Sequence, residues 1–292
     1  MEIRKNEPLK NHTSFKIGGP AEEFSEAKST EDVIALIEYA KQKGIPYMIM
    51  GNGSNLLVSD KGVKGLVIKI SKGFDNVEII GERVIAEAGI LLSKLSNIVA
   101  ERELSGMEEV SGIPGTLGGG IYMNAGAYGG EMKDFIEKVT YLSNGEIKVA
   151  EKDELDFGYR HSRFSGTDDI ILSAELSLKK GDIAEIRKKM ADFNERRCSK
   201  QPLSMPSAGS TFKRPEGYFA GKLIEDAGLK GFSIGGAQVS EKHSGFVVNT
   251  GSATAEDVFS LIKHIQDTVY AKFGIKLETE VKLVGEFLCS LR

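Results

Sequence analysis

Two glycine-rich segments contain the residues of this sequence that are best suited to hold a ligand. The first, G-N-G-S-N-L at residues 51–56, follows a strand-like stretch. Its backbone amides can form a concavity that binds an anion, although an ordinary Gly/Asn turn has the same composition. The second, at residues 111–130, is too long and too rich in glycine for a hairpin, and such loops inside a compact domain are usually functional. Together they indicate a dinucleotide whose pyrophosphate lies along backbone amides.

Three polar residues elsewhere suit catalysis, and each also has a structural explanation. Ser210 follows two prolines that stiffen its loop, so it is either a presented hydroxyl or a serine that hydrogen-bonds its own turn. Arg160 lies in the basic run Y-R-H-S-R-F, which also suits a solvated strand end. Glu280 belongs to the alternating run L-E-T-E-V-K-L-V-G and fits the polar face of a strand. None of the three is diagnostic by itself.

Several other motifs are absent or incomplete. The sequence contains no G-x-x-x-x-G-K-[ST] segment, no H-E-x-x-H segment and no Cys/His cluster, so a P-loop and a metal site are not expected. A Rossmann fingerprint is also missing, because Leu56 stands where its third glycine would be. Ser233 lies in a G-x-S-x-G match, but the nucleophile elbow of a serine hydrolase needs a strand before it and a helix after it. Because a helical pattern precedes Ser233, a hydrolase is a remote alternative.

Composition narrows the class of protein further. A chain of 292 residues suffices for about two compact domains. The 38 basic and 42 acidic residues give a net charge of −4, which provides no positive field for nucleic acid or an anionic membrane. Cys198 and Cys289 do not form a disulfide framework, and neither an apolar leader nor a long apolar stretch is present. A soluble cytoplasmic protein is therefore expected.

Hydrophobic periodicity predicts strands alternating with helices in the first half of the chain and an α+β second half. Apolar residues at helical spacing predict helices at 29–44, at 220–228 and at 254–269, and a further helix that carries Ile183, Ile186, Met190 and Phe193 and ends in basic residues. Two of these begin with a capping pair, Ser29 with Asp32 and Thr254 with Asp257. The run 277–285 is expected to be a strand, and the lysine-rich turn at 179–181 marks the expected domain boundary.

Six segments stand in an order that is found in a known family. They are N-H-T-S-F-K-I-G-G-P, G-N-G-S-N-L-L, I-P-G-T-L-G-G-G with M-N-A-G-A-Y-G, G-Y-R-H-S-R-F, P-S-A-G-S-T-F-K-R-P and L-E-T-E-V. This order resembles that of the UDP-N-acetylenolpyruvoylglucosamine reductases, flavoenzymes of peptidoglycan precursor synthesis. The resemblance leaves out the tail L-C-S-L-R at 288–292, to which no role is assigned. Because a short loop joins Arg214 to Phe219, the tyrosine-bearing insertion of one subclass is absent, and the chain resembles the type II form.

The resemblance implies an α+β fold in two parts. Residues 1–178 would form an FAD-binding region of the vanillyl-alcohol oxidase type, with two α/β subdomains split near residue 70. Residues 179–292 would form an α+β substrate-binding domain. FAD would be held non-covalently, without a bond to His12. The residues that match the family's cofactor contacts are Gly51, Asn52, Gly53, Ser54, Asn55, Leu56, Ser111, Gly112, Pro114, Gly115, Gly118, Gly119, Asn124, Ala125 and Gly126.

The resemblance also implies a reaction, the reduction of UDP-N-acetylglucosamine enolpyruvate to UDP-N-acetylmuramate. NADPH would reduce FAD, flavin N5 would give hydride to the substrate, and Ser210 would donate the proton. Arg160 and Glu280 would lie by the enolpyruvyl carboxylate. The residues expected to hold the UDP diphosphate or the sugar are Lys200, Arg214 and His243.

The same resemblance implies a place in the cell and a set of partners. The enzyme would act in cell wall biogenesis, and therefore in cell shape, the cell cycle and cell division. A monomer is expected, with NADPH and the UDP-sugar as its partners and with no nucleic acid or membrane partner. Another FAD oxidoreductase of the same fold is the nearest alternative.

Overall fold

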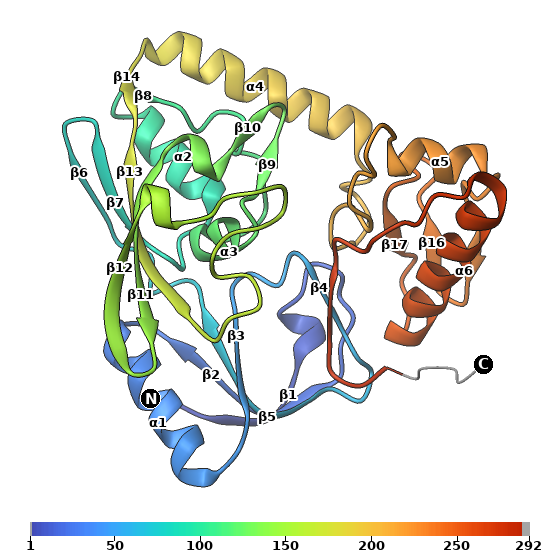
Figure 1. Ribbon diagram of the computed structural model, residues 1–292, viewed down its shortest axis with the longest axis horizontal. Coiled ribbons are helices and arrows are strands. Elements are labelled where there is room, and N and C mark those ends of the chain that lie inside the picture. Colours follow the sequence, from blue (N-terminus) through green and yellow to red (C-terminus); the bar gives the residue numbers. More distant parts are fainter. Residues whose placement is uncertain (1, 288–292) are drawn as a thin grey trace. The chain divides into compact units, whose positions relative to one another are not determined.

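The structure, a computed structural model, describes residues 2–287 of the chain (Figure 1). The chain forms two compact units, and each unit gathers separate stretches of the sequence. Unit 1 contains Glu2, Ser25–Asn52 and Val67–Arg197, and unit 2 contains Ile3–Phe24, Gly53–Leu66 and the chain from Cys198 onwards. The tail at 288–292, with Cys289, lies outside the described residues.

These compact units differ from the contiguous division expected at residue 178. Residues 179–197 belong to unit 1. Strands β2 (Pro20–Ala27) and β5 (Val63–Ile70) each pass from one unit into the other. The predicted FAD-binding region at 1–178 was defined by function, whereas the two units are defined by contacts within the chain. The units therefore do not test the predicted region, which stays a prediction. A division of the sequence into contiguous domains cannot describe units that are each formed by several separate stretches of the chain.

Unit 1 contains an antiparallel sheet with the strand order β12-β11-β13-β7-β6. Its strands are Glu146–Glu151, Ile136–Ser143, Ile170–Ser177, Arg83–Glu87 and Val77–Ile80, in that order. Val139, Ala174 and Ala86 are cross-strand neighbours and are buried. Helix α3 (Leu117–Tyr122) contacts β13 and β7. The sheet therefore supports the second glycine segment, to which α3 belongs.

That second glycine segment differs from the long loop expected from the sequence. It contains α3 and the first strand of a hairpin formed by β9 (Gly126–Ala127) and β10 (Gly130–Glu131). The sequence L-G-G-G-I-Y has a low intrinsic helix propensity, which is why the helix was not expected. Its first turn is closed by Thr116, whose Oγ1 accepts a hydrogen bond from the Gly119 N–H at 3.4 Å. Packing on the sheet thus overrides the local preference of the chain.

The helix expected at 29–44 is confirmed as α1 (Thr30–Lys43). The Asp32 N–H donates to Ser29 Oγ at 3.2 Å, as the capping pair predicts, and Gly44 ends the helix with φ at +64°. Strand β3 (Tyr47–Met50) follows and leads into the first glycine segment. It is an outer strand of a sheet ordered β1-β2-β5-β3, in which β1 is Arg4–Pro8.

The remaining elements of unit 1 are short, apart from one long helix. Helix α2 (Leu92–Ala100) contacts β8 (Leu104–Ser105), which pairs with β14 (Lys179–Lys180). The helix expected from residue 183 is confirmed as α4 (Ile183–Lys200), although its last residues belong to unit 2. Short 3-10 turns lie at Leu9–Asn11 (in unit 2), Met132–Asp134 and Lys152–Glu154.

Unit 2 is built on helix α6 (Ala255–Phe273), which contacts strands β15 (Ser233–Ile234) and β16 (Ala237–Val239). Strand β17 (Val247–Asn249) completes this sheet, and helix α5 (Ala220–Asp226) contacts α6. The apolar stripe predicted for α6 is confirmed as part of the core, as Val258, Leu261, Ile262, Ile265 and Val269. The same core contains Phe15, Leu57, Ala208 and Phe212. It therefore joins α6 to the loops that carry candidate site residues.

The strand expected at 277–285 is shorter than predicted. Only Lys282–Val284 forms a strand, β18, and it pairs in parallel with β4 (Leu56–Val58). Upstream of β18, Thr279 forms a single antiparallel bridge with Phe212. The alternating pattern predicts one strand. In the structure, the run pairs first with the loop at Phe212 and then with strand β4. This change of partner places Glu280 between the two.

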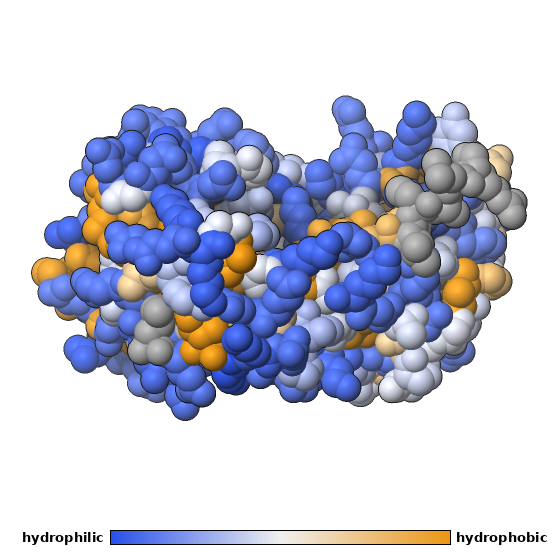
Figure 2. Space-filling model, turned by 90° about the horizontal axis from the view of Figure 1, so that it is seen from below, coloured by the Kyte–Doolittle hydropathy of each residue, from blue (hydrophilic) through white to orange (hydrophobic). Residues whose placement is uncertain are grey.

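Among the described residues, no helix is long and apolar enough to cross a membrane. The face of the molecule drawn in Figure 2 is mostly hydrophilic, with apolar residues in separate small groups. The most exposed large apolar side chains include Ile147 and Val149 on β12 and Phe219 ahead of α5. Scattered apolar residues of this kind are normal on protein surfaces.

Because α6 organises unit 2, weakening its N-terminal cap is expected to lower stability. The Asp257 N–H donates to Thr254 Oγ1 at 3.0 Å, and Asp257 Oδ2 accepts from the Thr254 N–H at 3.0 Å. We expect Thr254→Ala to reduce the free energy of unfolding by about 1 kcal/mol in urea titrations. The matched control is Ser252→Ala at an exposed position two residues earlier, with an expected change within about 0.5 kcal/mol. Equal effects of the two substitutions would contradict the role given to the cap.

Candidate active site

The first glycine segment forms a turn between β3 and β4 whose amide groups point away from internal partners. Among the described residues, the N–H groups of Asn52, Gly53, Ser54 and Asn55 donate no hydrogen bond. Gly53 has φ at +64°, a conformation that glycine adopts without strain. Consecutive unpaired amides of this kind suit an anion such as a pyrophosphate. The turn therefore fits the group that the sequence predicted for it.

In unit 1, this turn contacts the second glycine segment. Asn52 Nδ2 donates to the Pro114 carbonyl at 2.7 Å. A Cβ on Gly51 would collide with Thr116 Oγ1, so glycine is required where the two segments meet. The amides of Gly112 and Gly115 also donate no hydrogen bond within the described part of the chain. The structure thus brings the two predicted cofactor segments together at residues 51–52 and 114–116.

Several glycines of the second segment are explained by internal packing. A Cβ on Gly118 would lie 3.0 Å from Ala88 Cβ, and one on Gly120 would lie 3.1 Å from Leu92 Cδ1. A Cβ on Gly126 would lie 2.7 Å from the Gly130 carbonyl oxygen. The sequence suggested that such glycines let a cofactor approach. The close approach of the backbone is sufficient to require glycine at position 126, whereas at positions 118 and 120 a Cβ would need the neighbouring side chain to shift by a few tenths of an ångström.

Asn124, predicted to bind the cofactor, has a fully buried side chain that bonds within the protein. Its Nδ2 donates to Glu131 Oε2 at 3.0 Å and to the Gly158 carbonyl at 2.9 Å. Its Oδ1 accepts from the Lys133 N–H at 3.0 Å, and the residue has 0% exposure. The Asn124 side chain therefore connects the glycine segment to the turn that precedes Arg160 and has no surface left for a ligand.

Arg160 lies in a tight turn in which Gly158 and His161 exchange backbone hydrogen bonds at 3.0 and 3.2 Å. Its φ is +54°, an uncommon value for a residue with a side chain. Its Nη2 donates to the Gly126 carbonyl at 3.4 Å, and its guanidinium lies 4.9 Å from the centre of the Tyr159 ring. The turn thus holds a half-buried guanidinium against the second glycine segment.

Ser210 belongs to unit 2. It lies between Gly209, which has a left-handed backbone conformation, and Thr211, whose backbone and side chain are both hydrogen-bonded. Downstream, the Thr211 N–H donates to the Gly245 carbonyl at 2.9 Å, and Thr211 Oγ1 accepts from the Val247 N–H at 3.0 Å. Gly209, just upstream, has φ at +76°. The hydroxyl of Ser210 is half-buried and forms no hydrogen bond with any described residue. It is therefore available to a ligand rather than committed to its own turn.

Glu280 connects the serine loop to the first glycine turn within unit 2. Its N–H donates to the Thr211 carbonyl at 2.9 Å, and its carbonyl accepts from Asn55 Nδ2 at 3.1 Å. The Lys282 N–H donates back to the Asn55 carbonyl at 2.9 Å. Three predicted site regions, each distant from the others in the sequence, are thus joined by direct hydrogen bonds.

The three residues predicted to hold the nucleotide sugar have different environments. Lys200 is the exposed last residue of α4. The guanidinium of Arg214 stacks 4.2 Å from the centre of the exposed Phe219 ring. His243 Nδ1 accepts from the Gly245 N–H at 3.1 Å, so in the neutral ring the proton is on Nε2. Burial lowers the pKa of His243, which favours this neutral form. Of the three, His243 is tied most directly to the serine loop, because the Gly245 carbonyl accepts from Thr211.

Two polar residues that the sequence did not single out also contact the serine loop. The Asn249 N–H donates to the Pro206 carbonyl at 2.9 Å, and its buried Nδ2 donates to the Phe15 carbonyl at 3.2 Å. Ser14 Oγ donates to the Ser207 carbonyl at 2.7 Å. A polar residue closing the apolar run F-V-V-N was the available signal for Asn249. Ser14 gave none beyond its place in the N-H-T-S-F segment.

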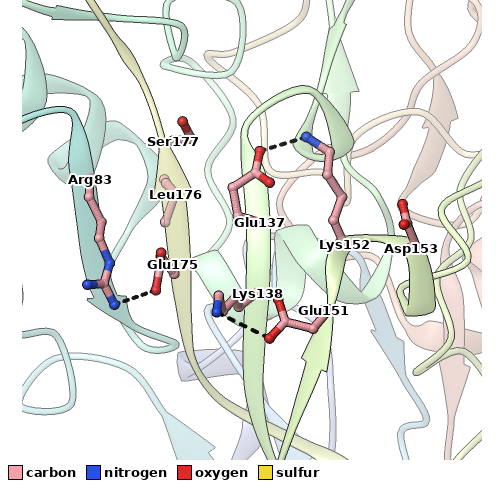
Figure 3. A pocket seen from close by; sticks show the side chains of 9 residues that line it. All are labelled: Arg83, Glu137, Lys138, Glu151, Lys152, Asp153, Glu175, Leu176 and Ser177. Carbon is pink, nitrogen blue, oxygen red and sulfur yellow. Dashed lines mark hydrogen bonds and ion pairs between the residues drawn. The ribbon is translucent and has the colours of Figure 1, made fainter.

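A cavity of about 420 Å³ lies elsewhere, on the sheet of unit 1 (Figure 3). Six of its seven charged side chains, all but that of Asp153, form ion pairs: Arg83 with Glu175 at 2.6 Å, Lys138 with Glu151 at 3.2 Å and Lys152 with Glu137 at 2.7 Å. None of the predicted site residues lines it. Because both of its lysines and its arginine are already paired with carboxylates, the cavity offers no unpaired cation for the phosphates of a cofactor.

Ser233 lacks the setting of a hydrolase nucleophile. It lies in the two-residue strand β15, which turns directly into the antiparallel strand β16 rather than into a helix. Its hydroxyl donates to the Gly231 carbonyl at 3.4 Å. The strand–turn–helix geometry that an elbow requires is therefore absent at this position.

Two family models match this chain. A model described as "FAD binding domain" matches residues 22–150, and one described as "UDP-N-acetylenolpyruvoylglucosamine reductase, C-terminal domain" matches residues 201–284. These matches and the fold define an FAD-binding oxidoreductase with an α+β C-terminal domain, which confirms the predicted fold class and the predicted FAD cofactor.

Three relatives identify the family. A UDP-N-acetylenolpyruvoylglucosamine reductase of Caldanaerobacter subterraneus is 57% identical over 282 residues, covering 96% of this chain and 93% of the relative. One of Clostridioides difficile is 50% identical over 286 residues, covering 98% and 94%. A crystal structure of the Thermus caldophilus enzyme matches with a TM-score of 0.85 and 36% identity, covering 97% of this chain and 98% of that one. The chain belongs to the UDP-N-acetylenolpyruvoylglucosamine reductase family, as its six motifs indicated.

The low pKa of His243 predicts how stability depends on pH. As the pH falls through the ordinary histidine value of 6.5, the unfolded chain takes up a proton that the folded protein resists. The free energy of unfolding therefore decreases between about pH 7.5 and pH 5.5. We expect His243→Gln to lose less stability than the wild type over this interval in urea titrations at both pH values. An identical loss in the two proteins would contradict this interpretation.

Proposed function

We propose that this chain catalyses the NADPH-dependent reduction of UDP-N-acetylglucosamine enolpyruvate to UDP-N-acetylmuramate in peptidoglycan precursor synthesis. The observation that carries the proposal is the set of direct hydrogen bonds among Asn55, Glu280 and Thr211, which joins the serine loop to the first glycine turn. The names of the relatives and the match to the family's C-terminal domain support the choice of substrate. We further propose that the enzyme works as a monomer in the cytoplasm.

The two glycine segments would hold FAD non-covalently through backbone amides. The unpaired N–H groups at residues 52–55 suit the pyrophosphate, and those of Gly112 and Gly115 offer further donors. Bound there, FAD would supply the redox chemistry, the transfer of a hydride equivalent from NADPH to the vinyl carbon of the substrate. The role of the chain is to fix this group and to supply the proton and the charge that the substrate needs.

Ser210 would donate the proton to the carbon next to the one that is reduced. A serine hydroxyl is a weak acid, but a carbon with carbanion character is a strong base, so position matters more than acidity. The fixed backbone at Thr211 and the uncommitted hydroxyl of Ser210 meet this requirement.

Arg160 would bind the enolpyruvyl carboxylate. Negative charge that develops on the substrate spreads into that carboxylate, and a planar guanidinium can stabilise it through two parallel hydrogen bonds. The contact with Gly126 sets the orientation of the guanidinium. Glu280 would lie by the same carboxylate, where repulsion between like charges requires that Glu280 be protonated or paired with a cation.

Lys200, Arg214 and His243 would bind the UDP portion of the substrate. Two of them supply positive charge that an acidic protein with a net charge of −4 needs for a diphosphate. His243 offers its Nε2–H as a neutral donor, because its Nδ1 already accepts from Gly245. The stacked pair of Arg214 and Phe219 presents both a cation and an aromatic face.

The proposal is tested by measuring the two half-reactions separately with the FAD-loaded enzyme under anaerobic conditions. The visible absorbance of the flavin should decrease on addition of NADPH and recover on addition of the enolpyruvyl sugar. In Ser210→Ala, the flavin should be reduced by NADPH at a nearly wild-type rate and be reoxidised by the enolpyruvyl sugar roughly 10²–10⁴-fold more slowly, because only the second step needs the proton donor. Equal slowing of both steps would show that Ser210 has another role. Recovery with oxygen but not with the UDP-sugar would favour another FAD oxidoreductase of this fold.

Arg160→Lys tests the two-point contact with the carboxylate. A point charge cannot reproduce the planar fork of arginine, so recovery of absorbance should slow on the order of 10²-fold. Arg163→Lys is the matched control, because Arg163 donates to the Tyr141 hydroxyl at 3.3 Å and has no proposed substrate contact. Unchanged turnover in Arg160→Lys would refute the assignment.

A further inference from the structure

Ser14 lies at a junction between the two loops that unit 2 contributes to the site. Its hydroxyl donates to the Ser207 carbonyl at 2.7 Å, across 193 positions of the sequence. Its backbone N–H donates to the Gly53 carbonyl at 3.3 Å. One residue therefore contacts both the serine loop and the first glycine turn, and only the contact with the serine loop depends on its side chain.

The contact with Ser207 is transmitted to Ser210 because little of the intervening chain is free to move. Ala208 is 5% exposed and belongs to the same hydrophobic core as Phe15, the residue after Ser14. Phe212, two residues beyond Ser210, is part of this core as well. A shift of the Ser207 carbonyl must therefore be absorbed at Gly209 and Ser210.

The segment that carries Ser14 is fixed by other interactions. Thr13 Oγ1 donates to the Ile17 carbonyl at 2.9 Å, and the His12 ring lies 2.8 Å from Glu7 Oε1. Phe15 is 2% exposed. Loss of the Ser14 hydroxyl alone should leave this segment in place and release only the serine loop.

We propose that Ser14 is a positioning residue for proton transfer: its hydroxyl holds the backbone ahead of Ser210, so that the Ser210 hydroxyl stays in register with the glycine turn. This inference rests on the proposed function, because it assumes that Ser210 donates the proton. Ser14 touches neither substrate nor cofactor in this role. It closes a ring of contacts whose members are Ser14, Gly53, Asn55, Glu280, Thr211 and Ser207.

The test compares Ser14→Ala, Ser14→Cys and the control Ser252→Ala in the FAD-loaded enzyme. Ser14→Ala should leave reduction by NADPH unchanged and slow reoxidation by the enolpyruvyl sugar roughly ten- to a hundredfold, as expected for a small displacement of a reacting group. Ser14→Cys keeps a weak donor of similar shape and should slow reoxidation less. Ser252→Ala removes an exposed serine hydroxyl of unit 2 that does not contact Ser207 and should leave both rates near wild type.

A second measurement does not depend on catalysis. Amide hydrogen exchange in the peptide covering residues 208–213 should accelerate in Ser14→Ala and stay at the wild-type rate in Ser252→Ala. If Ser14→Ala does not fold, the same comparison is made with Ser14→Cys. Unchanged exchange together with unchanged reoxidation would overturn the inference, as would equal slowing of both half-reactions.

The experiments distinguish failure of the positioning role of Ser14 from failure of the proposed function. If Ser210→Ala slows reoxidation and Ser14→Ala does not, the proposed function stands and the positioning role is wrong. If Ser210→Ala has no effect on reoxidation, the proposed function itself fails, and the positioning role fails with it even if exchange accelerates.

Discussion

A ring of hydrogen bonds in unit 2 is the constraint on which the candidate site depends. The Glu280 backbone bonds to Thr211 on one side and to the side chain of Asn55 on the other. Backbone groups within a protein must find partners when they are removed from water, and here the partners come from three distant parts of the sequence. The strain-tolerant position Gly209 and the uncommitted Ser210 hydroxyl lie inside this fixed frame. For the proposed proton transfer, a mobile loop could not hold the Ser210 hydroxyl at the reacting carbon with comparable accuracy.

In unit 1, an equivalent constraint comes from close packing rather than from a ring. Asn124 is buried, and its amide ties the glycine segment to the turn before Arg160. Gly118, Gly120 and Gly126 let the segment lie against neighbouring chain that a Cβ would displace. Arg160 has a left-handed backbone conformation, and such a conformation persists only where the surrounding structure determines it. The guanidinium is therefore held by its surroundings rather than by the preference of its own residue.

The sequence predicted more of the scaffold than of the contacts. Apolar spacing and capping pairs located α1, α4 and α6 correctly, because helix periodicity and N-terminal caps are local properties of the chain. The six motifs identified the family, which the relatives confirm. Helix α3 was missed because its glycines oppose helix formation, and the strand at 277–285 was overextended because its pattern did not reveal a change of partner.

By itself, the sequence determined which residue types are available: two segments rich in glycine, Arg160 in a basic run, Ser210 after two prolines, and a negative net charge. Only the tertiary structure decided how each is used. It committed the Asn124 side chain to the interior, made Ser14 a neighbour of Ser207 and left the Ser210 hydroxyl without a partner among the described residues. The physical reason is that hydrogen bonds of the site join distant positions: Ser14 and Ser207 are 193 residues apart, and Asn55 and Glu280 are 225 residues apart. Such pairings follow from how the whole core packs rather than from any local pattern.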